Sequence, residues 1–177
     1  MARYLAELDR WRRRINLTGT LSAQELATHA LESTLGASLI AHGERVVDIG
    51  SGAGFPGLPL AIVRPDLSVT LVEPRQRRAA FLRHAVRELL LRNTTVFQGR
   101  IEEVGGQTFD TATTRAVGQL PRWMGDAAFL RPAGTLLAWT TDPEKLEIGL
   151  APLFSLESAV AIPGTTRRKI AAYRKRP

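Results

Sequence analysis

Apolar side chains return at helical spacing in the first fourteen residues of the chain. Residues 3–14 are therefore expected to form a short amphipathic helix with arginines on its outer face. After a loop, Ser22 and Glu25 have the spacing of a capping box that opens a second helix. We expect that helix to run to about Ala41 and to end at Gly43. The pattern thus predicts a small helical extension over residues 1–43.

From Arg45 onward, short β-rich runs alternate with helical patterns. Strands are expected at 46–49, 69–73, 94–97, 110–114 and 134–139, and helices at 57–63, 76–91, 121–130 and 143–150. This alternation is typical of βαβ units on a parallel sheet. Two further strands, at 153–162 and 169–174, are separated by a turn at Pro163 and Gly164 rather than by a helix. We therefore predict one α/β domain over residues 44–177, in which a mostly parallel sheet ends in an antiparallel hairpin.

Composition restricts the possible classes of protein. The chain has 177 residues, of which 44% are hydrophobic, so it can bury a core that needs no disulfide or metal to stabilise it. It contains no Cys, which excludes disulfide frameworks, Cys-ligated metals and a Cys nucleophile. No apolar run approaches the ~20 residues of a membrane span, and no secretion signal is recognisable. We therefore expect a cytoplasmic protein that does not associate with a membrane, and a monomer, since nothing calls for an oligomer.

The net charge of +7 is unevenly distributed along the chain. Between residues 75 and 100 there are seven arginines and one acid, and residues 165–177 contain six basic residues and no acid. Such clusters are typical of proteins that bind polyanions, although a solvated face of helix 76–91 would also carry arginines. The candidates for RNA contact are Arg83, Arg87, Arg167 and Arg168.

A glycine-rich stretch at residues 50–57, Gly-Ser-Gly-Ala-Gly-Phe-Pro-Gly, lies between a predicted strand and a predicted helix. Glycines let the backbone approach a ligand closely, and the start of the helix presents free N–H groups. The spacing fits the dinucleotide fingerprint. With Asp48 in front of it, the loop also fits the acid-x-Gly-x-Gly pattern of methyltransferases that use S-adenosylmethionine. Because an acid would repel a pyrophosphate but attract a sulfonium cation, the pattern favours the methyl donor.

Glu73 ends the next predicted strand, at 69–73. A carboxylate at this position can accept hydrogen bonds from both ribose hydroxyls of an adenosine. The ribose does not discriminate between NAD and S-adenosylmethionine, because both ligands contain it. The candidate cofactor contacts from this pattern are Asp48, Gly52 and Glu73.

The segment Phe55-Pro56-Gly57-Leu58-Pro59 is far more specific than the glycines. Further matching segments are Asn16-Leu17-Thr18, His29 with Ser33, Arg77-Arg78 with Phe81-Leu82, Leu91-x-Asn93, Arg100-Ile101-Glu102 and Arg115-Ala116. With these segments the chain resembles the small-subunit ribosomal RNA guanine-N7 methyltransferase family, also called glucose-inhibited division protein B. The resemblance runs from about residue 16 to residue 116, and weaker matches continue to residue 177.

The resemblance implies a Rossmann-like, class I S-adenosylmethionine-dependent methyltransferase fold with a seven-stranded sheet. It implies S-adenosylmethionine as cofactor, and as acceptor the N7 atom of a guanine in the decoding-region loop of 16S ribosomal RNA, in the small ribosomal subunit. The chain departs from the family where Glu32 replaces a usual Asp, where Thr140 and Thr141 replace a usual Lys-Gly pair, and where Lys169 replaces a usual His. By motif position, the implied cofactor contacts are Gly50, Phe55, Ile101, Glu102 and Arg115.

The absence of an evident catalytic constellation agrees with this chemistry. Guanine N7 has a lone pair and no proton to lose, so the enzyme has to hold the reacting atoms ~3–3.5 Å apart and aligned rather than supply a base. No catalytic side chain is therefore predicted, and the three His residues share no metal-ligand spacing. A target base would be flipped out and could stack on an aromatic side chain. The candidates for stacking are Phe55, Trp123, Trp139 and Tyr173.

Three other functions fit parts of the sequence. The first is a methyltransferase that acts on another RNA or on a small molecule with the same cofactor site. The second is a non-catalytic RNA-binding ribosome assembly factor, which would bind no S-adenosylmethionine. The third is an NAD-linked oxidoreductase, which would bind NADH instead.

Overall fold

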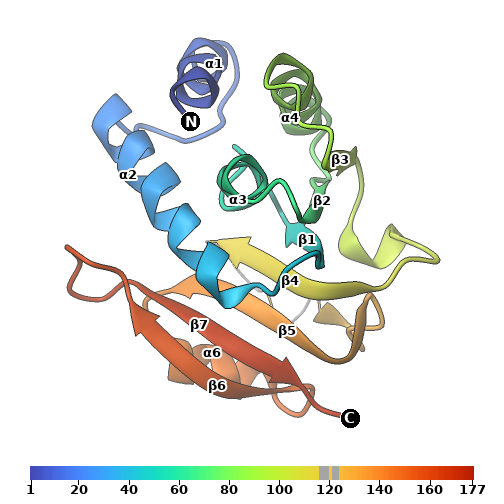
Figure 1. Cartoon of the computed structure of the whole chain (residues 1–177). Helices are drawn as coiled ribbons and strands as arrows, with labels where there is room; N and C mark the ends of the chain where they lie inside the picture. The colour runs from blue at the N-terminus through green and yellow to red at the C-terminus, as the bar shows by residue number, and fades with distance from the viewer. Residues whose placement is uncertain (116–119, 121–123) are drawn as a thin grey trace.

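The computed structural model describes residues 1–177 except 116–119 and 121–123. In this part of the chain the strands form one seven-stranded sheet with the order β3-β2-β1-β4-β5-β7-β6 (Figure 1). Neighbours among β1 to β5 pair in parallel, whereas β7 is antiparallel to both β5 and β6. The predicted parallel sheet with a terminal antiparallel hairpin is thereby confirmed. The strands are β1 (Arg45–Ile49), β2 (Ser68–Val72), β3 (Thr94–Phe97), β4 (Phe109–Arg115), β5 (Leu130–Thr140), β6 (Phe154–Ala161) and β7 (Lys169–Lys175).

The helices follow the predicted segments with a few differences at their ends. The capping box is present, because the Ser22 hydroxyl accepts from the Glu25 N–H and the Glu25 carboxylate accepts from the Ser22 N–H. In the described residues, no helix is long and apolar enough to cross a membrane. The helices are α1 (Ala2–Arg12), α2 (Ala23–Thr34), α3 (Gly57–Val63), α4 (Gln76–Glu88) and α6 (Pro143–Leu150), with 3-10 turns at η1 (Leu35–Leu39) and η2 (Ile101–Glu103).

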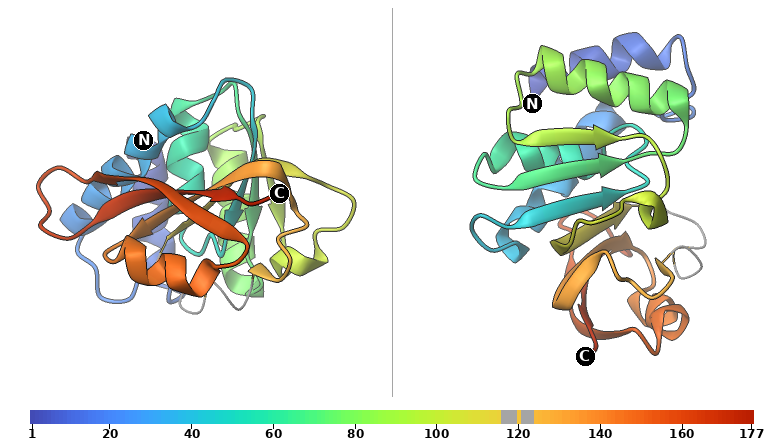
Figure 2. Two further views of the ribbon diagram at one scale, coloured as in Figure 1. Left: turned by 90° about the horizontal axis from the view of Figure 1, so that it is seen from below. Right: turned by 90° about the vertical axis from the view of Figure 1, so that its right-hand side faces the viewer.

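Two apolar cores lie on opposite faces of the sheet. Successive side chains of a strand point to opposite faces, so Val46 belongs to one core and Val47 to the other. The first core is covered by α1, α2, α3 and α4, and the second includes Leu150 from α6 (Figures 1 and 2). The helical extension of residues 1–43 therefore packs on the same side of the sheet as α3 and α4. It shares their core, in which Tyr4 and Leu8 are fully buried.

The second helix ends earlier than the sequence predicted. The α-helix stops at Thr34 and continues as the 3-10 turn η1, not as a helix to Ala41. Gly36 in this turn lies against the indole of Trp139, and a Cβ at Gly36 would be only 2.5 Å from the ring. The change in helical geometry coincides with this close approach of the turn to β5.

The helix predicted at 121–130 is wrong over its second half. Residues 121–123 lie outside the described residues. Gly125 and Ala127 have left-handed backbone angles, and Leu130 already begins β5. The carbonyl of Phe129 accepts from the N–H of Phe109, so this segment joins the sheet instead of forming a helix.

Candidate active site

The glycine loop lies between the carboxyl end of β1 and the start of α3. Gly50, Gly52 and Gly54 have φ values of 70°, 56° and 99°, which is the region that favours glycine. The N–H groups of Gly50 and Ser51 both donate to the carbonyl of Val72, at 2.9 and 3.1 Å. These bonds attach the loop to the end of β2. The loop is thus a fixed backbone structure at the carboxyl edge of the sheet, where parallel α/β folds bind ligands.

Asp48 supports this loop from beneath and does not line the cavity beside it. Its side chain is fully buried, and its two oxygens accept from the Gly57 N–H at 3.2 Å and from the Thr113 hydroxyl at 3.0 Å. A Cβ at Gly57 would be 2.7 Å from Asp48 Oδ2, so the glycine is needed for this approach. The expectation that Asp48 faces the cofactor's cation is corrected here, because both oxygens of its carboxylate already accept hydrogen bonds from Gly57 and Thr113.

Burial dominates the ionisation of Asp48. Removal from water raises the pKa of Asp48 from 3.8 to about 6, against the opposing effect of its hydrogen bonds. The folded protein therefore takes up a proton at Asp48 at a higher pH than the unfolded chain does.

Glu73 directly follows β2, close to its predicted place at the end of this strand, and it lies in the cavity wall. Its side chain is buried, with one oxygen accepting from the Gly52 N–H at 2.9 Å and the other from the Arg75 N–H at 2.8 Å. Each carboxylate oxygen can accept more than one hydrogen bond. Glu73 therefore holds the loop in place and keeps acceptor capacity for hydroxyl groups in the cavity.

Two hollows meet at this edge of the sheet. The larger has a volume of about 420 Å³ and lies between the loop, Glu73 and the helical extension. The smaller, of about 240 Å³, is lined by apolar side chains of Ile49, Val72 and Ile101, together with Glu102. Both are lined by Gly50, Pro74 and Arg75, so they form one bent site. Of the eight predicted cofactor contacts, the seven other than Asp48 line it: Gly50, Gly52, Phe55, Glu73, Ile101, Glu102 and Arg115.

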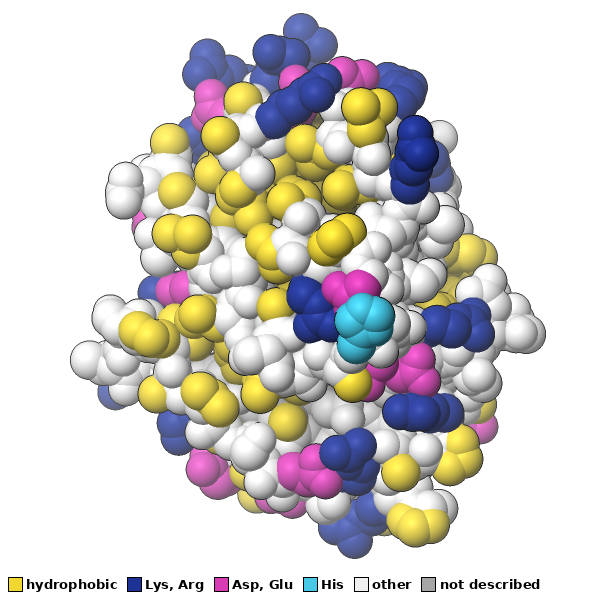
Figure 3. Space-filling view, in the orientation of Figure 1, with side chains coloured by type: hydrophobic (Ala, Val, Ile, Leu, Met, Phe, Trp, Pro, Cys, Tyr) yellow, Lys and Arg dark blue, Asp and Glu magenta, His cyan; other side chains and the backbone are white. Residues whose placement is uncertain are grey.

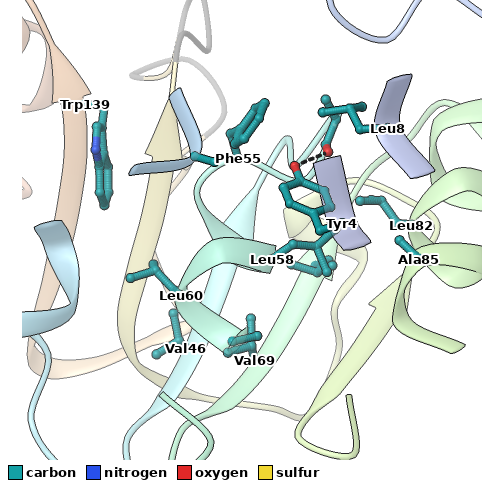
Figure 4. Packing of buried hydrophobic residues seen from close by; sticks show 14 of the residues in the cluster. Tyr4, Leu8, Val46, Phe55, Leu58, Leu60, Val69, Leu82, Ala85 and Trp139 are labelled. Carbon is teal, nitrogen blue, oxygen red and sulfur yellow. Dashed lines mark hydrogen bonds between the residues drawn. The ribbon is translucent and has the colours of Figure 1, made fainter. Parts of the chain in front are cut away.

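The helical extension supplies one wall of the larger hollow, which the sequence pattern did not predict. The Tyr4 hydroxyl of α1 donates to the carbonyl of Ala53 in the loop at 2.8 Å, and its ring meets Phe55 edge to face at 5.7 Å (Figure 4). His29 of α2 also meets Phe55 edge to face, at 6.1 Å. Burial, followed by the charge of Arg115, lowers the pKa of His29. The remaining lining residues from the extension are Leu17, Thr18 and Leu21.

Arg115 lies at the end of β4, where the sequence placed it, but its guanidinium is held by protein groups. It donates to the Glu32 carboxylate at 2.9 Å and to the His29 carbonyl at 3.1 Å, and it lies 6.0 Å from the centre of the Phe55 ring. Burial lowers the pKa of Arg115, opposed by Glu32. Arg168 pairs with the same carboxylate at 2.9 Å. Glu32 therefore joins α2 to β4 and to the segment before β7.

The other predicted RNA contacts are spread over the surface. Arg83 and Arg87 are on the exposed side of α4, where Arg83 donates to Gln98 and Arg87 lies 3.5 Å from Glu88. Arg167 is exposed. Arg168 is only half-exposed, because Glu32 engages it, which corrects the expectation of a freely available tail arginine.

The aromatic candidates for base stacking are also separated. Phe55 lines the cavity, whereas Trp139 is 93% buried and donates its indole N–H to the Glu32 carbonyl. Tyr173 is fully buried in the second core, with its hydroxyl on the Pro143 carbonyl, so it cannot stack on a base. Trp123 lies outside the described residues. Phe55 is therefore the aromatic ring among the described candidates that faces the bent site.

Comparison with known proteins shows the family of the chain. The sequence model of the family GidB, rRNA small subunit methyltransferase G, matches residues 1–152. The chain belongs to this family. A ribosomal RNA small subunit methyltransferase G from Roseiflexus castenholzii is 46% identical over 127 residues, which cover 67% of this chain and 54% of that protein. The protein of that name from Nitrosomonas europaea is 42% identical over 128 residues, 70% of this chain and 58% of that protein.

The chain thus spans little more than half the length of these GidB relatives. Among solved structures, MtNAS in complex with S-adenosylmethionine superposes with a TM-score of 0.73 at 19% identity, over 100% of this chain and 73% of that one. A SAM-dependent methyltransferase from Aquifex aeolicus superposes with a TM-score of 0.71 at 14% identity, over 96% and 97% of the two chains. These likenesses establish the fold, which is that of class I methyltransferases, and they confirm the predicted fold class.

The raised pKa of Asp48 predicts a pH-dependent stability difference between this protein and its Asp48→Asn variant. The folded protein binds the proton more tightly than the unfolded chain does, so this contribution to stability is full below pH 3.8 and is lost as the pH rises through about 6. The free energy of unfolding of the native protein, minus that of the variant, should increase by about 2 kcal/mol between pH 8 and pH 4.

Urea unfolding at several pH values measures this difference, and the other titrating groups cancel because both proteins contain them. A difference that stays constant with pH would show that Asp48 does not titrate in this range.

Proposed function

We propose that the chain binds S-adenosylmethionine in the bent site and transfers its methyl group to N7 of a guanine in the decoding-region loop of 16S ribosomal RNA. The observation that carries this proposal is the position of Glu73. Its carboxylate lies at the end of β2, beside the glycine loop and next to the junction of the two hollows. A ribose bound there would direct its base into one hollow and the rest of the ligand into the other.

The residues present fit each part of this cofactor. Glu73 has acceptor capacity for the ribose hydroxyls, and the smaller hollow offers Ile49, Val72 and Ile101 as apolar surfaces for the adenine. Arg78 lines the larger hollow, and one of its nitrogens is 3.7 Å from where a Cβ of Gly52 would be. It supplies a cation for the carboxylate of an amino-acid tail. The bound cofactor would supply the reactive methyl group.

The protein's own residues then position the acceptor. Phe55 of the loop, together with His29 of α2 and Arg115 at the end of β4, offers two flat ring surfaces and a cation to an entering base. Because N7 carries a lone pair and no proton, these side chains have to orient the base and exclude water, and no side chain has to remove a proton. The lowered pKa of His29 favours its neutral form, which agrees with a role in packing and orientation.

The partner in this proposal is the small ribosomal subunit or its ribosomal RNA. Support comes from the net charge of +7 and from the basic side chains exposed on several elements. Figure 3 shows Lys and Arg side chains gathered at the upper end of one face, over α1 and α4. We place RNA phosphates on Arg83, Arg87 and Arg167, where exposed cations are available. In this proposal the protein works in the cytoplasm as a monomer.

The direct test is methylation of small subunits that lack the modification. The protein is incubated with labelled S-adenosylmethionine and these subunits, and the modified base is mapped. We expect label on N7 of one guanine of the decoding-region loop. Label on another RNA or on a small molecule would support the corresponding alternative. Binding of NADH without S-adenosylmethionine would contradict the cofactor assignment, and absence of both binding and transfer would favour an assembly factor.

Two valine variants provide the matched control for this assay. Gly50→Val places a branched side chain at a left-handed position that lines both hollows, so we expect loss of cofactor binding and of transfer. Gly43→Val introduces similar backbone strain, at φ 75°, but in open space at the surface. It should lose stability and keep cofactor affinity. Equal cofactor affinity of the two variants would contradict the loop assignment.

The hydroxyl of Tyr4 is predicted to position the loop for the cofactor. Tyr4→Phe keeps the ring and removes the donor to Ala53, so the buried carbonyl loses its partner and the loop is less restrained. Tyr173→Phe is the matched control, because its buried hydroxyl donates to the Pro143 carbonyl at 2.9 Å in the other core. Each variant should lose about 1–3 kcal/mol of stability.

Calorimetry separates the two variants. We expect the dissociation constant for S-adenosylmethionine to rise about fivefold to tenfold for Tyr4→Phe, equivalent to about 1–1.4 kcal/mol, and to stay unchanged for Tyr173→Phe. If both variants bind the cofactor as the native protein does, Tyr4 contributes to folding alone.

A further inference from the structure

A third hollow, of about 390 Å³, adjoins the active-site cavity and shares two of its wall residues, His29 and Arg115. It lies at the carboxyl ends of β4 and β5, beside the start of the antiparallel strand β7. His29 and Arg115, on which we place the acceptor base, therefore lie between the active-site cavity and this hollow. The remaining lining residues are Trp139, Thr140, Thr141, Ile162, Arg168 and Lys169.

The charges around this hollow are predominantly positive. Arg115, Arg168 and Lys169 line it, and its described lining contains no carboxylate. Glu32 is buried beside it and pairs with both arginines, at 2.9 Å each, so it compensates one of their charges. No ion pair engages Lys169 in the described part of the chain. An excess of positive charge remains, and it attracts an anion.

The polar groups of the hollow are suited to an oxyanion. Thr140 Oγ1 accepts a hydrogen bond from the Asp142 N–H at 3.2 Å, which leaves its own proton free to donate. Thr141 adds a second hydroxyl next to it. Hydroxyl and ammonium donors together are common partners of nucleic-acid phosphates.

The floor of the hollow is rigid. Trp139 is packed against Gly36 and donates its indole N–H to the Glu32 carbonyl at 3.1 Å. The paired register of Thr140 with Lys169 fixes the lysine backbone opposite the end of β5. The cation of Lys169 is thus presented from a paired strand and not from a free loop.

We propose that this hollow binds a backbone phosphate of the acceptor RNA, adjacent to the nucleotide whose base enters the active-site cavity, with Lys169 as the principal cation. The inference rests on the proposed function and adds a substrate subsite to it. A nucleotide that is flipped out of its stack has to be held through its backbone. The third hollow lies next to the cavity, across His29 and Arg115, so a phosphate bound in it would hold the nucleotide whose base enters the cavity. The two arginines are held by Glu32, so Lys169 is the cation in this hollow whose charge is available to the RNA.

The test compares two of the chain's three lysines. Lys169→Gln removes the charge from the hollow, and Lys145→Gln removes the same charge from an exposed position on α6. Binding to small subunits that lack the modification is measured over a range of salt concentrations, with S-adenosylhomocysteine present so that no turnover occurs. Lys169→Gln should weaken binding about tenfold at 0.1 M salt and lower the slope of log affinity against log salt by about one.

Lys145→Gln and the charge-preserving Lys169→Arg should bind subunits as the native protein does. Calorimetry with S-adenosylhomocysteine alone should show the same affinity for all four proteins. The proposal is overturned if Lys169→Gln binds subunits as Lys145→Gln does. It is also overturned if Lys169→Gln loses affinity for S-adenosylhomocysteine by the same factor as it loses affinity for subunits.

The failure of the proposed function would be recognised separately. If the native protein binds subunits but transfers no methyl group to them, the assignment of the reaction fails. The salt slope of Lys169→Gln still decides whether the hollow binds a phosphate, because it measures binding without turnover.

Discussion

The site depends on how a loop of left-handed glycines is held in one shape. The loop cannot continue the hydrogen bonding of β1, so its N–H groups need other acceptors. Glu73 accepts from Gly52 at 2.9 Å, and Asp48 accepts from Gly57, the first residue of α3, at 3.2 Å. These two buried carboxylates fix both the loop and the helix after it. The bent site lies along that backbone, between the loop, Glu73 and the helical extension.

The helical extension completes the site from the other side. Tyr4 reaches the loop from α1, and His29 and Glu32 reach Phe55 and Arg115 from α2. The extension also shares a core with α3 and α4, so the same packing that buries its apolar side stabilises its wall of the cavity. The hydrophobic pattern changes between residues 1–43, which is helical, and residues 44–177, where strands and helices alternate. The contacts of Tyr4 and Glu32 nevertheless make the two segments parts of one site.

Local pattern explains why much of the fold could be predicted. The period of apolar residues located α3 at 57–63 and β3 at 94–97, and it predicted the strand after the glycine loop, which ends at Glu73. The end of α2 and the segment before β5 could not be predicted in this way. They depend on the contact of Gly36 with Trp139 and on the pairing of Phe109 with Phe129, which join residues distant along the chain.

The same distinction explains the errors at the site. The charge of Asp48 suggested a cation as its partner, yet an N–H group of α3 and the Thr113 hydroxyl, 65 positions away, satisfy it. The sequence located Arg115 at the end of its strand, but it marked Glu32 only as a departure from the family and gave no sign that Glu32 pairs with an arginine 83 positions later. Sequence reasoning therefore located the groups at strand ends but could not assign their partners.

The most direct test of this account is a crystal structure of the chain with S-adenosylhomocysteine bound. We expect both ribose hydroxyls to donate to Glu73, the adenine to lie in the hollow beside Ile101, and the bonds from Gly52 and Gly57 to the two carboxylates to persist. A ligand bound away from Glu73, or a loop that abandons these bonds when the ligand binds, would contradict it.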